Sequence, residues 1–471
     1  MAKLLNDNFR DKKVLVFGLG VLGGGVATTN WLIKHGARVT VTDLKDENYL
    51  ERSLKRIKGN PKLRLNGHDK KDIEDNEIIV FNPDVSIKNP FVQYAMKLGK
   101  QIENEASIFY KLCPRPIIAV TGTRGKTTTT NWVGHFLGAK YNAVVSGNSY
   151  AEPMLKTLDR IAAFDFVANE IPSYHLEYFD GSIPPPEIAV ITNLYQDHLN
   201  RHGMMEDYAL AKASIFKNQA AKQSLILNRD SKWTPFFLKR KPFSKIWFFS
   251  IKPLPKKDKG VFYKDGSIYF QNGGGPEEAI NLGDFMKKWG THNIENLLAA
   301  SLAAHIAGVP WVKISKKIKD LPQIQFRQET IFNDKHVAVV NDTAATSPDG
   351  GIAAIRRFSL PGTILIAGGT DRDLDYRDWA IAAKRLIGKE NLILLDGSAT
   401  KKIIKALGPT GKKITVLDSL RECVKVAFAK ARLYPKSVVL FSPAAKSFEK
   451  FKNEFDRGRQ FNLLVKKELK S

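Results

Sequence analysis

The sequence TGTRGKTT occupies residues 121–128 and directly follows the apolar run PIIAV at residues 116–120. A helical pattern then covers residues 129–138. A buried strand, a Gly-Lys-Thr turn and a helix together form a phosphate cradle, in which backbone N–H groups and the lysine face phosphates and the threonine hydroxyl faces Mg²⁺. Val120 stands where the usual phosphate-loop motif begins with glycine, so this loop is a variant. It predicts ATP or GTP binding by Gly122, Thr123, Arg124, Gly125, Lys126, Thr127 and Thr128.

A second glycine-rich turn lies closer to the N-terminus. The apolar run Lys13–Phe17 precedes GLGVLG at residues 18–23, and a helical pattern and a second apolar run, Arg38–Thr42, follow. Asp43 lies twenty residues after the last glycine of this turn, where dinucleotide-binding folds place an acid that binds ribose. Glycines at a strand-to-helix turn serve any phosphate-bearing ligand, so NAD is only one candidate. The predicted phosphate-binding glycines are Gly18, Gly20 and Gly23.

The remainder of the chain predicts a third α/β region. Strand-like apolar runs occur at residues 336–340, Thr363–Ala367, residues 391–395, residues 414–417 and Ser437–Phe441, with helical patterns between them. Such alternation is typical of a doubly wound α/β domain. The chain is therefore predicted to be α/β with a Rossmann-like domain at residues 1–113, a central P-loop ATPase-like domain with a mixed or parallel sheet at residues 114–322, and a doubly wound Rossmann-like domain at residues 323–471.

Composition narrows the class of protein. The chain has 471 residues, 43% of them hydrophobic and 26% charged, which is ordinary for a globular protein. The net charge is +25, but the lysines are scattered, which favours a solvated surface and anionic substrates over nucleic acid. Two cysteines fit a reducing compartment, and neither a signal-peptide core nor a run of ~18 apolar residues is present. We expect a cytoplasmic enzyme with no nucleic-acid partner and no membrane span.

Further motifs follow the phosphate loop along the chain. They are GN at residues 147–148, NEIPSYHLE at 169–177, NLYQDHLNR at 193–201 with Tyr208 and AK at 211–212, GTHNIEN at 290–296, RQE at 327–329, NDTAAT at 341–346 and SPAAKSFEKFKNEFDRG at 442–458. In sequence and order they resemble the Mur ligase family, the ATP-dependent amide-bond ligases of peptidoglycan synthesis. The resemblance covers residues 13–461, and the last block is most similar to the members that add glutamate.

The resemblance implies a ligase that adds D-glutamate to UDP-N-acetylmuramoyl-L-alanine. ATP would phosphorylate the substrate carboxylate, and the amine of glutamate would displace the phosphate. It also implies two Mg²⁺ ions and a Lys212 carbamylated by CO₂, since a bare ammonium would repel Mg²⁺. The implied catalytic residues are Lys126, Glu170, His198 and Lys212. The implied metal ligands are Thr127, Glu170, His198 and Lys212.

The same resemblance distributes the substrate contacts over the three domains. Additional ATP contacts would be Asn296, Arg327 and Asp342. The UDP-linked substrate would contact Gly18, Gly20, Gly23, Asp43 and Asn148. Glutamate would contact Thr346, Arg372 and Ser447. We expect a monomer whose partners are these small molecules alone.

The sequence departs from the family pattern mainly around the predicted glutamate site. Ala344 stands at the position of a family lysine, and Arg372 at that of another lysine. Arg124 replaces asparagine in the phosphate loop, and Phe326 replaces histidine. A ligase that adds L-glutamate and a folate-polyglutamate-type ligase therefore stay open as alternatives. A NAD-dependent dehydrogenase would leave Lys126 and His198 without a role, and a non-catalytic nucleotide-binding module would explain none of the catalytic motifs.

Overall fold

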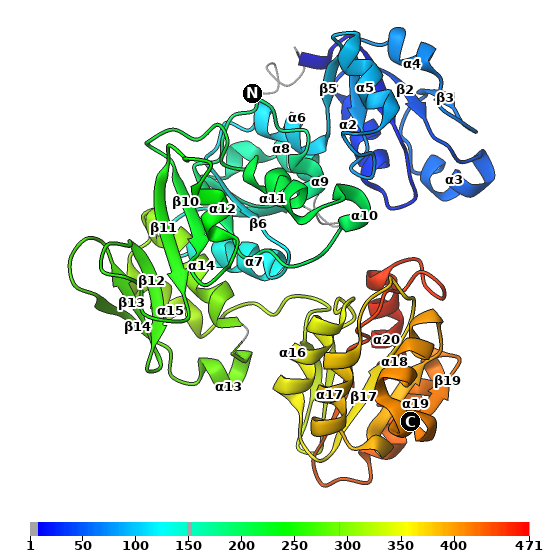
Figure 1. Ribbon diagram of the computed structural model, residues 1–471. Helices are drawn as coiled ribbons and strands as arrows, with labels where there is room; N and C mark the ends of the chain where they lie inside the picture. Colours follow the sequence, from blue (N-terminus) through cyan, green and yellow to red (C-terminus); the bar gives the residue numbers. More distant parts are fainter. Residues whose placement is uncertain (1–7, 148–152, 292, 471) are drawn as a thin grey trace. The chain divides into compact units, whose positions relative to one another are not determined.

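The computed structural model describes residues 8–147, 153–291 and 293–470 (Figure 1). The chain divides into two compact units, of which the first extends to Pro322 and the second begins at Gln323. Three sheets with helices between their strands confirm the predicted α/β fold. The predicted limit between residues 113 and 114 lies inside the first unit, and the domain limits stay predictions.

The first sheet has the strand order β3-β2-β1-β4-β5, and all its strands are parallel. This order places the GLGVLG turn after the central strand β1, as in other Rossmann-like sheets. The strands are β1 (Lys13–Phe17), β2 (Arg38–Thr42), β3 (Lys62–Arg64), β4 (Ile78–Phe81) and β5 (Gln101–Glu103). The helices are α2 (Gly24–Lys34), α3 (Glu47–Leu54), α4 (Lys70–Glu74), α5 (Pro90–Lys97) and α6 (Glu105–Leu112).

The central sheet has the order β14-β13-β12-β11-β10-β9-β6-β8-β7. It is parallel from β7 to β12 and antiparallel at β13 and β14, so it is mixed as expected. The strands are β6 (Ile117–Thr121), β7 (Ala143–Gly147), β8 (Phe166–Glu170), β9 (Ile188–Ile191), β10 (Ser224–Asn228), β11 (Lys245–Ser250), β12 (Gly260–Lys264), β13 (Ser267–Gln271) and β14 (Glu277–Asn281). The helices are α7 (Lys126–Leu137), α8 (Met154–Leu158), α9 (Ser173–Leu176), α10 (Leu199–His202), α11 (Met205–Ala213), α12 (Thr234–Leu238), α13 (Phe285–Trp289), α14 (Asn293–Ile306) and α15 (Trp311–Ile318).

The second unit contains the third sheet, with the order β15-β16-β20-β17-β18-β19. Only the edge strand β15 is antiparallel to its neighbour. The strands are β15 (Glu329–Asn333), β16 (Val337–Asn341), β17 (Thr363–Ala367), β18 (Leu392–Leu395), β19 (Thr415–Leu417) and β20 (Ser437–Phe441). The helices are α16 (Pro348–Phe358), α17 (Arg377–Leu386), α18 (Ser398–Leu407), α19 (Leu420–Ala431) and α20 (Glu454–Glu468).

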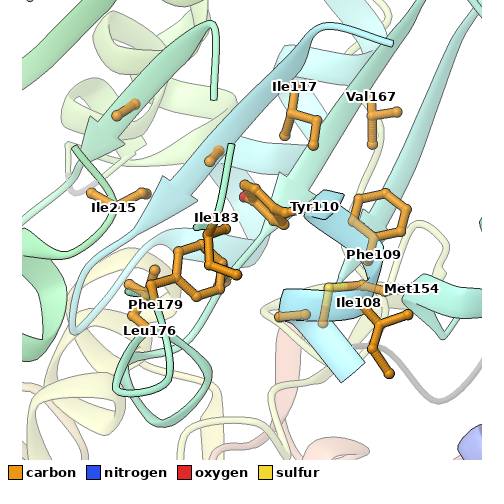
Figure 2. Packing of buried hydrophobic residues seen from close by; sticks show 14 of the residues in the cluster. Ile108, Phe109, Tyr110, Ile117, Met154, Val167, Leu176, Phe179, Ile183 and Ile215 are labelled. Carbon is orange, nitrogen blue, oxygen red and sulfur yellow. The ribbon is translucent and has the colours of Figure 1, made fainter. Parts of the chain in front are cut away.

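Successive side chains of β6 point to opposite faces of the central sheet and enter two different cores. Ile118 and Val120 pack with α7 and α14, whereas Ile117 and Ala119 belong to a core that also includes side chains of α6, α8 and α11. Figure 2 shows Phe109 and Tyr110 of α6 in this second core. Because α6 follows the last strand of the first sheet directly, its packing joins the first sheet to the central one within a single unit.

The predicted first residue of the helix after the phosphate loop is wrong. The helix α7 begins at Lys126, three residues earlier than the pattern indicated. Gly125 precedes it with φ 80°, a left-handed conformation that glycine adopts without steric cost. Lys126, Thr127 and Thr128 therefore form the first helical turn, where backbone N–H groups remain available to an anion. Among the described residues, no helix has both the length and the hydrophobicity that a membrane span requires.

Candidate active site

The phosphate loop connects β6 to α7 and depends on two glycines. Gly122 has φ 147° and Gly125 φ 80°. A Cβ atom on Gly122 would lie 1.9 Å from Oγ1 of Thr192, and one on Gly125 would lie 2.1 Å from Oδ1 of Asn296. Neither position therefore accepts a side chain without displacing its neighbours. Asn296, predicted as an ATP contact, thus lies beside the loop from α14, and its Oδ1 also accepts a hydrogen bond from Thr129 at 3.2 Å.

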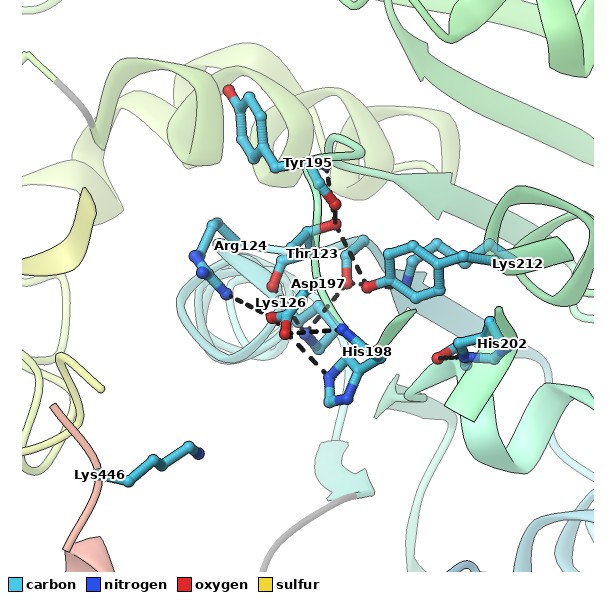
Figure 3. Close-up of polar contacts among 12 residues, drawn as sticks. Thr123, Arg124, Lys126, Tyr195, Asp197, His198, His202, Lys212 and Lys446 are labelled. Atoms are coloured by element: carbon cyan, nitrogen blue, oxygen red, sulfur yellow. Dashed lines mark hydrogen bonds and ion pairs between the residues drawn. The ribbon is translucent and has the colours of Figure 1, made fainter. Parts of the chain in front are cut away.

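The segment after β9 holds the loop through backbone and side-chain hydrogen bonds. Asn193 Oδ1 accepts from the backbone N–H of Arg124 at 2.8 Å, and Asn193 O accepts from that of Thr123 at 3.0 Å. Thr123 Oγ1 accepts from the N–H of Tyr195 at 3.0 Å and lies 3.3 Å from the hydroxyl of Tyr208 (Figure 3). The loop conformation is therefore built into the protein by residues about 70–85 positions away in sequence.

Two lysine ammonium groups converge on one carbonyl of this loop. Lys126 Nζ donates to Gly122 O at 3.0 Å and to Thr123 O at 3.1 Å. Lys212 Nζ, which comes from α11, donates to the same Gly122 O at 2.9 Å. Lys126 and Lys212 thus place two basic side chains at one carbonyl of the phosphate loop.

Lys212 is almost completely buried, with 1% of its surface exposed. Its ammonium lies 4.5 Å from the ring centre of Tyr208. Burial, and then the positive charge of Lys126, lower the pKa of Lys212 well below its ordinary value of 10.5. A lowered pKa increases the fraction of the neutral amine, which is the form that reacts as a nucleophile.

Asp197 and His198 lie next to the loop on the connection that leads to α10. Asp197 accepts a hydrogen bond from Nη1 of Arg124 at 2.9 Å, and its carboxylate is 3.8 Å from Nε2 of His198 (Figure 3). Burial alone would raise the pKa of Asp197, but His198 and Arg124 lower it below its ordinary value. His198 itself has φ 55°, a conformation uncommon for a residue with a side chain, and its imidazole is about one-third exposed.

Glu170 ends β8, and the sheet places it next to the phosphate loop. In the parallel register it is the partner of Val120 on β6 and of Gly147 on β7. Glu170 is buried, with 8% of its surface exposed. Thr127 approaches the same edge as the second residue of α7. Within the described residues no group of three or more His, Cys, Asp or Glu side chains is arranged to hold a metal. The metal set of Thr127, Glu170, His198 and Lys212 therefore stays a prediction.

The GLGVLG turn has the backbone that a phosphate-binding loop requires. Gly18, Gly20 and Gly23 all have positive φ, from 61° to 95°. Asp43 is buried, and its two carboxylate oxygens accept the backbone N–H groups of Gly20 and Lys45, each at 2.9 Å. Asp43 therefore holds the turn in place, a role that the sequence did not indicate. The predicted contact Asn148 lies outside the described residues, as does His292 of the GTHNIEN motif.

In the second unit, Asp342 follows β16 and is buried at the edge of the third sheet. Its oxygens accept from Oγ of Ser442 at 2.7 Å and from the N–H of Gln328 at 3.0 Å. Burial raises the pKa of Asp342 to about 7. Arg327 is exposed, and Phe326, at the position of the family histidine, is buried with φ 64°.

The three residues predicted for glutamate lie on loops at one edge of the third sheet. Thr346, Arg372 and Ser447 follow β16, β17 and β20, which are parallel neighbours, so their loops leave the sheet at the same edge. Arg372 is exposed and Thr346 is half-buried. Ser447 is 2% exposed, and its Oγ has no hydrogen-bond partner among the described residues. A buried hydroxyl without a partner is costly, which fits a group that a ligand completes.

Arg457 is a structurally important residue to which the sequence gave no role. Its guanidinium is fully buried and donates to Oγ1 and O of Thr343, O of Ala445 and O of Lys446, all at 2.9–3.0 Å. Arg457 thereby ties the loop that contains Thr346 to the loop that contains Ser447. The only sequence signal was its place in the SPAAKSFEKFKNEFDRG block.

Comparisons with known proteins identify the family of this chain. The Mur ligase middle domain matches residues 120–304, and the Mur ligase MurD-like N-terminal domain matches residues 12–104. The chain is 36% identical over 461 residues to a UDP-N-acetylmuramoylalanine–D-glutamate ligase of Roseiflexus sp. (strain RS-1), a match that covers 96% of this chain and 98% of that protein. The chain belongs to the Mur ligase family. A second Mur ligase with the same name, from Borreliella afzelii (strain PKo), is 33% identical and covers 98% of each chain.

Solved structures of Mur ligases share the fold. The UDP-N-acetylmuramate-alanine ligase MurC of Thermotoga maritima matches with a TM-score of 0.59 at 19% identity and covers 97% of this chain and 100% of its own. The MurF ligase of Thermotoga maritima, solved in complex with ADP, matches with a TM-score of 0.55 at 16% identity and covers 99% and 96%. The sequence-based assignment to the Mur ligases is therefore confirmed.

Proposed function

We propose that this Mur ligase uses ATP to join D-glutamate to UDP-N-acetylmuramoyl-L-alanine. The observation that carries the proposal is the convergence of Lys126 and the buried Lys212 on Gly122 O, at 3.0 and 2.9 Å, in a glycine-dependent phosphate loop. A dehydrogenase has no use for this pair. The names of relatives at 33–36% identity over nearly the whole chain support D-glutamate over the alternatives.

The reaction needs an activated carboxylate, because a carboxylate and an amine do not condense in water. The alanine carboxylate attacks the γ-phosphorus of ATP, the bond to the bridging oxygen breaks and ADP leaves. The glutamate amine then attacks the acyl phosphate, loses a proton, and inorganic phosphate leaves as the amide forms. Lys126 and the loop N–H groups supply positive charge where the phosphoryl group transfers, which is the main form of catalysis that such a step requires.

Mg²⁺ would neutralise phosphate charge during the transfer. Thr127, Glu170 and His198 would hold up to two ions from the ends of α7, β8 and the β9–α10 connection. Lys212 fits only after modification: its neutral amine would attack CO₂, form an N–C bond and release a proton, leaving an anionic carbamate. The burial and depressed pKa of Lys212 support this step.

The remaining predicted contacts complete the proposal. The GLGVLG turn would hold the UDP moiety, and Asn296, Arg327 and Asp342 would complete the ATP site. The edge with Thr346, Arg372 and Ser447 would hold glutamate. The enzyme would act as a cytoplasmic monomer on small molecules alone.

Incubation of the purified protein with UDP-N-acetylmuramoyl-L-alanine, ATP, Mg²⁺ and glutamate tests the function. We expect ADP release that requires both other substrates, and a product one glutamyl residue heavier by mass spectrometry. ADP release without a new amide, or none in the presence of all substrates, would refute the proposal. If product forms with L-glutamate only, the assignment of D-glutamate is wrong and the assignment of ligase activity stands.

A further inference from the structure

A second cavity lies on the other side of α11 from the phosphate loop. It has a volume of about 520 Å³ and is formed by the segment around Lys88, α11 and the turn after α12. This volume is typical of small-molecule sites. Asp207, Leu210, Ala211 and Ser214 line it and are spaced three or four residues apart, so they share one helix face. Tyr208 and Lys212 occupy a different face and contact the loop instead.

The charges around this cavity do not balance. Glu177 pairs with Arg201 at 2.8 Å, and Asp207 pairs with Lys88 at 2.9 Å. These two pairs neutralise every carboxylate that lines the cavity. Three further cations line it, and none of them forms an ion pair within the described part of the chain. They are Lys217, Arg240 and Lys241.

The same cavity has apolar walls. Leu210 is 43% exposed and Phe243 82% exposed, so both offer apolar surface to a molecule in the cavity. Phe216 and Ile87 also line the cavity. The guanidinium of Arg240 lies 4.4 Å from the ring centre of Phe236, an arrangement that keeps the cation beside an aromatic surface.

We propose that this cavity is a separate binding site for an organic phosphate with an aromatic or apolar body, up to about the size of a nucleotide. Lys217, Arg240 and Lys241, none of which is held in an ion pair by a described residue, match a phosphate dianion, since charge-assisted hydrogen bonds to phosphate are strong. The exposed Leu210 and Phe243 match the apolar body. The site goes beyond the proposed ligase reaction, because it shares no lining residue with the phosphate loop or with the predicted glutamate site.

1-Naphthyl phosphate is a suitable probe because it combines the two features. We expect saturable binding to the full-length protein in isothermal titration calorimetry, with a dissociation constant on the order of 1 mM or tighter. Inorganic phosphate and 1-naphthol each carry one feature only and should bind at least tenfold more weakly. Equal binding of 1-naphthol, or no saturable binding of 1-naphthyl phosphate, would overturn the proposal.

Variants distinguish this cavity from the phosphate loop. The double change Arg240→Ala with Lys241→Ala should weaken binding of the probe at least tenfold, and Leu210→Glu should do the same by placing an anion in the cavity. Lys239→Ala is the matched control, because Lys239 is an exposed neighbour that does not line the cavity. Lys126→Ala should also leave probe binding unchanged. Loss of binding in Lys126→Ala and retention in the double variant would place the probe in the phosphate loop and refute the proposal; unchanged thermal unfolding confirms that each variant is folded.

Discussion

The central and third sheets each present buried charged groups at the carboxyl ends of their parallel strands, but the charges differ in what surrounds them. At the central edge, the amino groups of Lys126 and Lys212 meet at Gly122 O, and each depends on few other partners. At the third edge, the charges of Asp342 and Arg457 are satisfied by hydroxyls and backbone groups of their own unit. Basic groups that are held close together at an electrostatic cost indicate a catalytic role. Charged groups whose hydrogen bonds are all made within their own unit indicate a structural role. Substitutions of Lys126 and Lys212 should therefore change rate most, and substitutions of Asp342 and Arg457 should change stability most.

Lys126→Ala should have the largest effect on rate. Its ammonium lies at the start of α7, where transferring phosphate would gain negative charge, and removal of one such contact typically costs ~10²–10³ in rate. Stability should change little, because Lys212 still donates to Gly122 O when Lys126 is removed. Turnover measured by coupled ADP release, together with a urea unfolding curve, checks both parts. Near-normal turnover would end the assignment of the ATP site.

Lys212→Ala should also be nearly inactive, and added short carboxylates should restore part of the activity. The variant lacks the group that would become an anionic ligand, and a small carboxylate can occupy the space that it leaves. Lys212→Met is the informative companion, since it fills the same space without charge. We expect it to be inactive, unrescued and at least as stable as the wild type, because a fully buried polar amine is replaced by an apolar chain of similar length. A high-resolution map with a bare ammonium beside ATP and Mg²⁺ would contradict the carbamate.

Asp342→Asn should change how the stability of the second unit depends on pH. Burial holds the folded pKa at about 7, above the ordinary value of 3.8, so the folded state keeps its proton over a range in which the unfolded chain has lost it. The contribution of Asp342 to stability is therefore full below about pH 4 and declines by up to about 1.4 kcal/mol per pH unit until about pH 7. Asparagine does not titrate and should remove this decline. Hydrogen exchange of peptides from β16 and β20 at pH 5 and pH 7.5, compared with the wild type at each pH, measures the second unit alone; equal differences at both values would contradict the shift.

Buried parallel strands were predictable from the sequence, and exposed ones were not. β1, β2, β17 and β20 coincide with the predicted apolar runs to the residue, because strands covered on both faces require nearly continuous apolar sequence. β3 is exposed at all three positions and has no such signal. The antiparallel strands β12–β14 were also missed, although the Asp265-Gly266 pair between β12 and β13 is a typical hairpin turn that could have located them.

In the candidate site, too, the residues of a local motif were predictable, and the contacts with residues distant in sequence were not. The glycines and Lys126 could be located from a single octapeptide. The bracing of that octapeptide by Asn193 and Asn296 depends on contacts between β6, the end of β9 and α14, which no local pattern encodes. Arg457 reads as a surface charge in a lysine-rich chain, and only tertiary packing shows that it is buried.

Arg372→Ala should produce the smallest effect and is the sharpest test of the comparison. Arg372 lies at the third edge but, unlike Asp342 and Arg457, it is exposed and makes no hydrogen bond or ion pair within the described residues. It should therefore behave as a ligand-binding residue on an edge that is otherwise architectural. A guanidinium offers paired donors to a carboxylate, and charge-assisted bonds contribute roughly 1.5–3 kcal/mol each. We expect the KM for glutamate to rise at least tenfold, with kcat and stability nearly unchanged.

Arg377→Ala is the matched control, since Arg377 begins α17 five residues after Arg372, is also exposed, and is already paired with Asp375. Its KM should equal that of the wild type. Assays with D- and L-glutamate, with the product resolved by chiral chromatography, complete the test, because Ala344 removes a cation that the family uses nearby. If Arg372 takes over the role of that cation, the loss in Arg372→Ala should be confined to the preferred enantiomer. An equal loss for both enantiomers would mean that Arg372 attracts glutamate by its charge without orienting it. An unchanged KM would mean that Arg372 does not bind glutamate and that the charged residues at this edge have structural roles only.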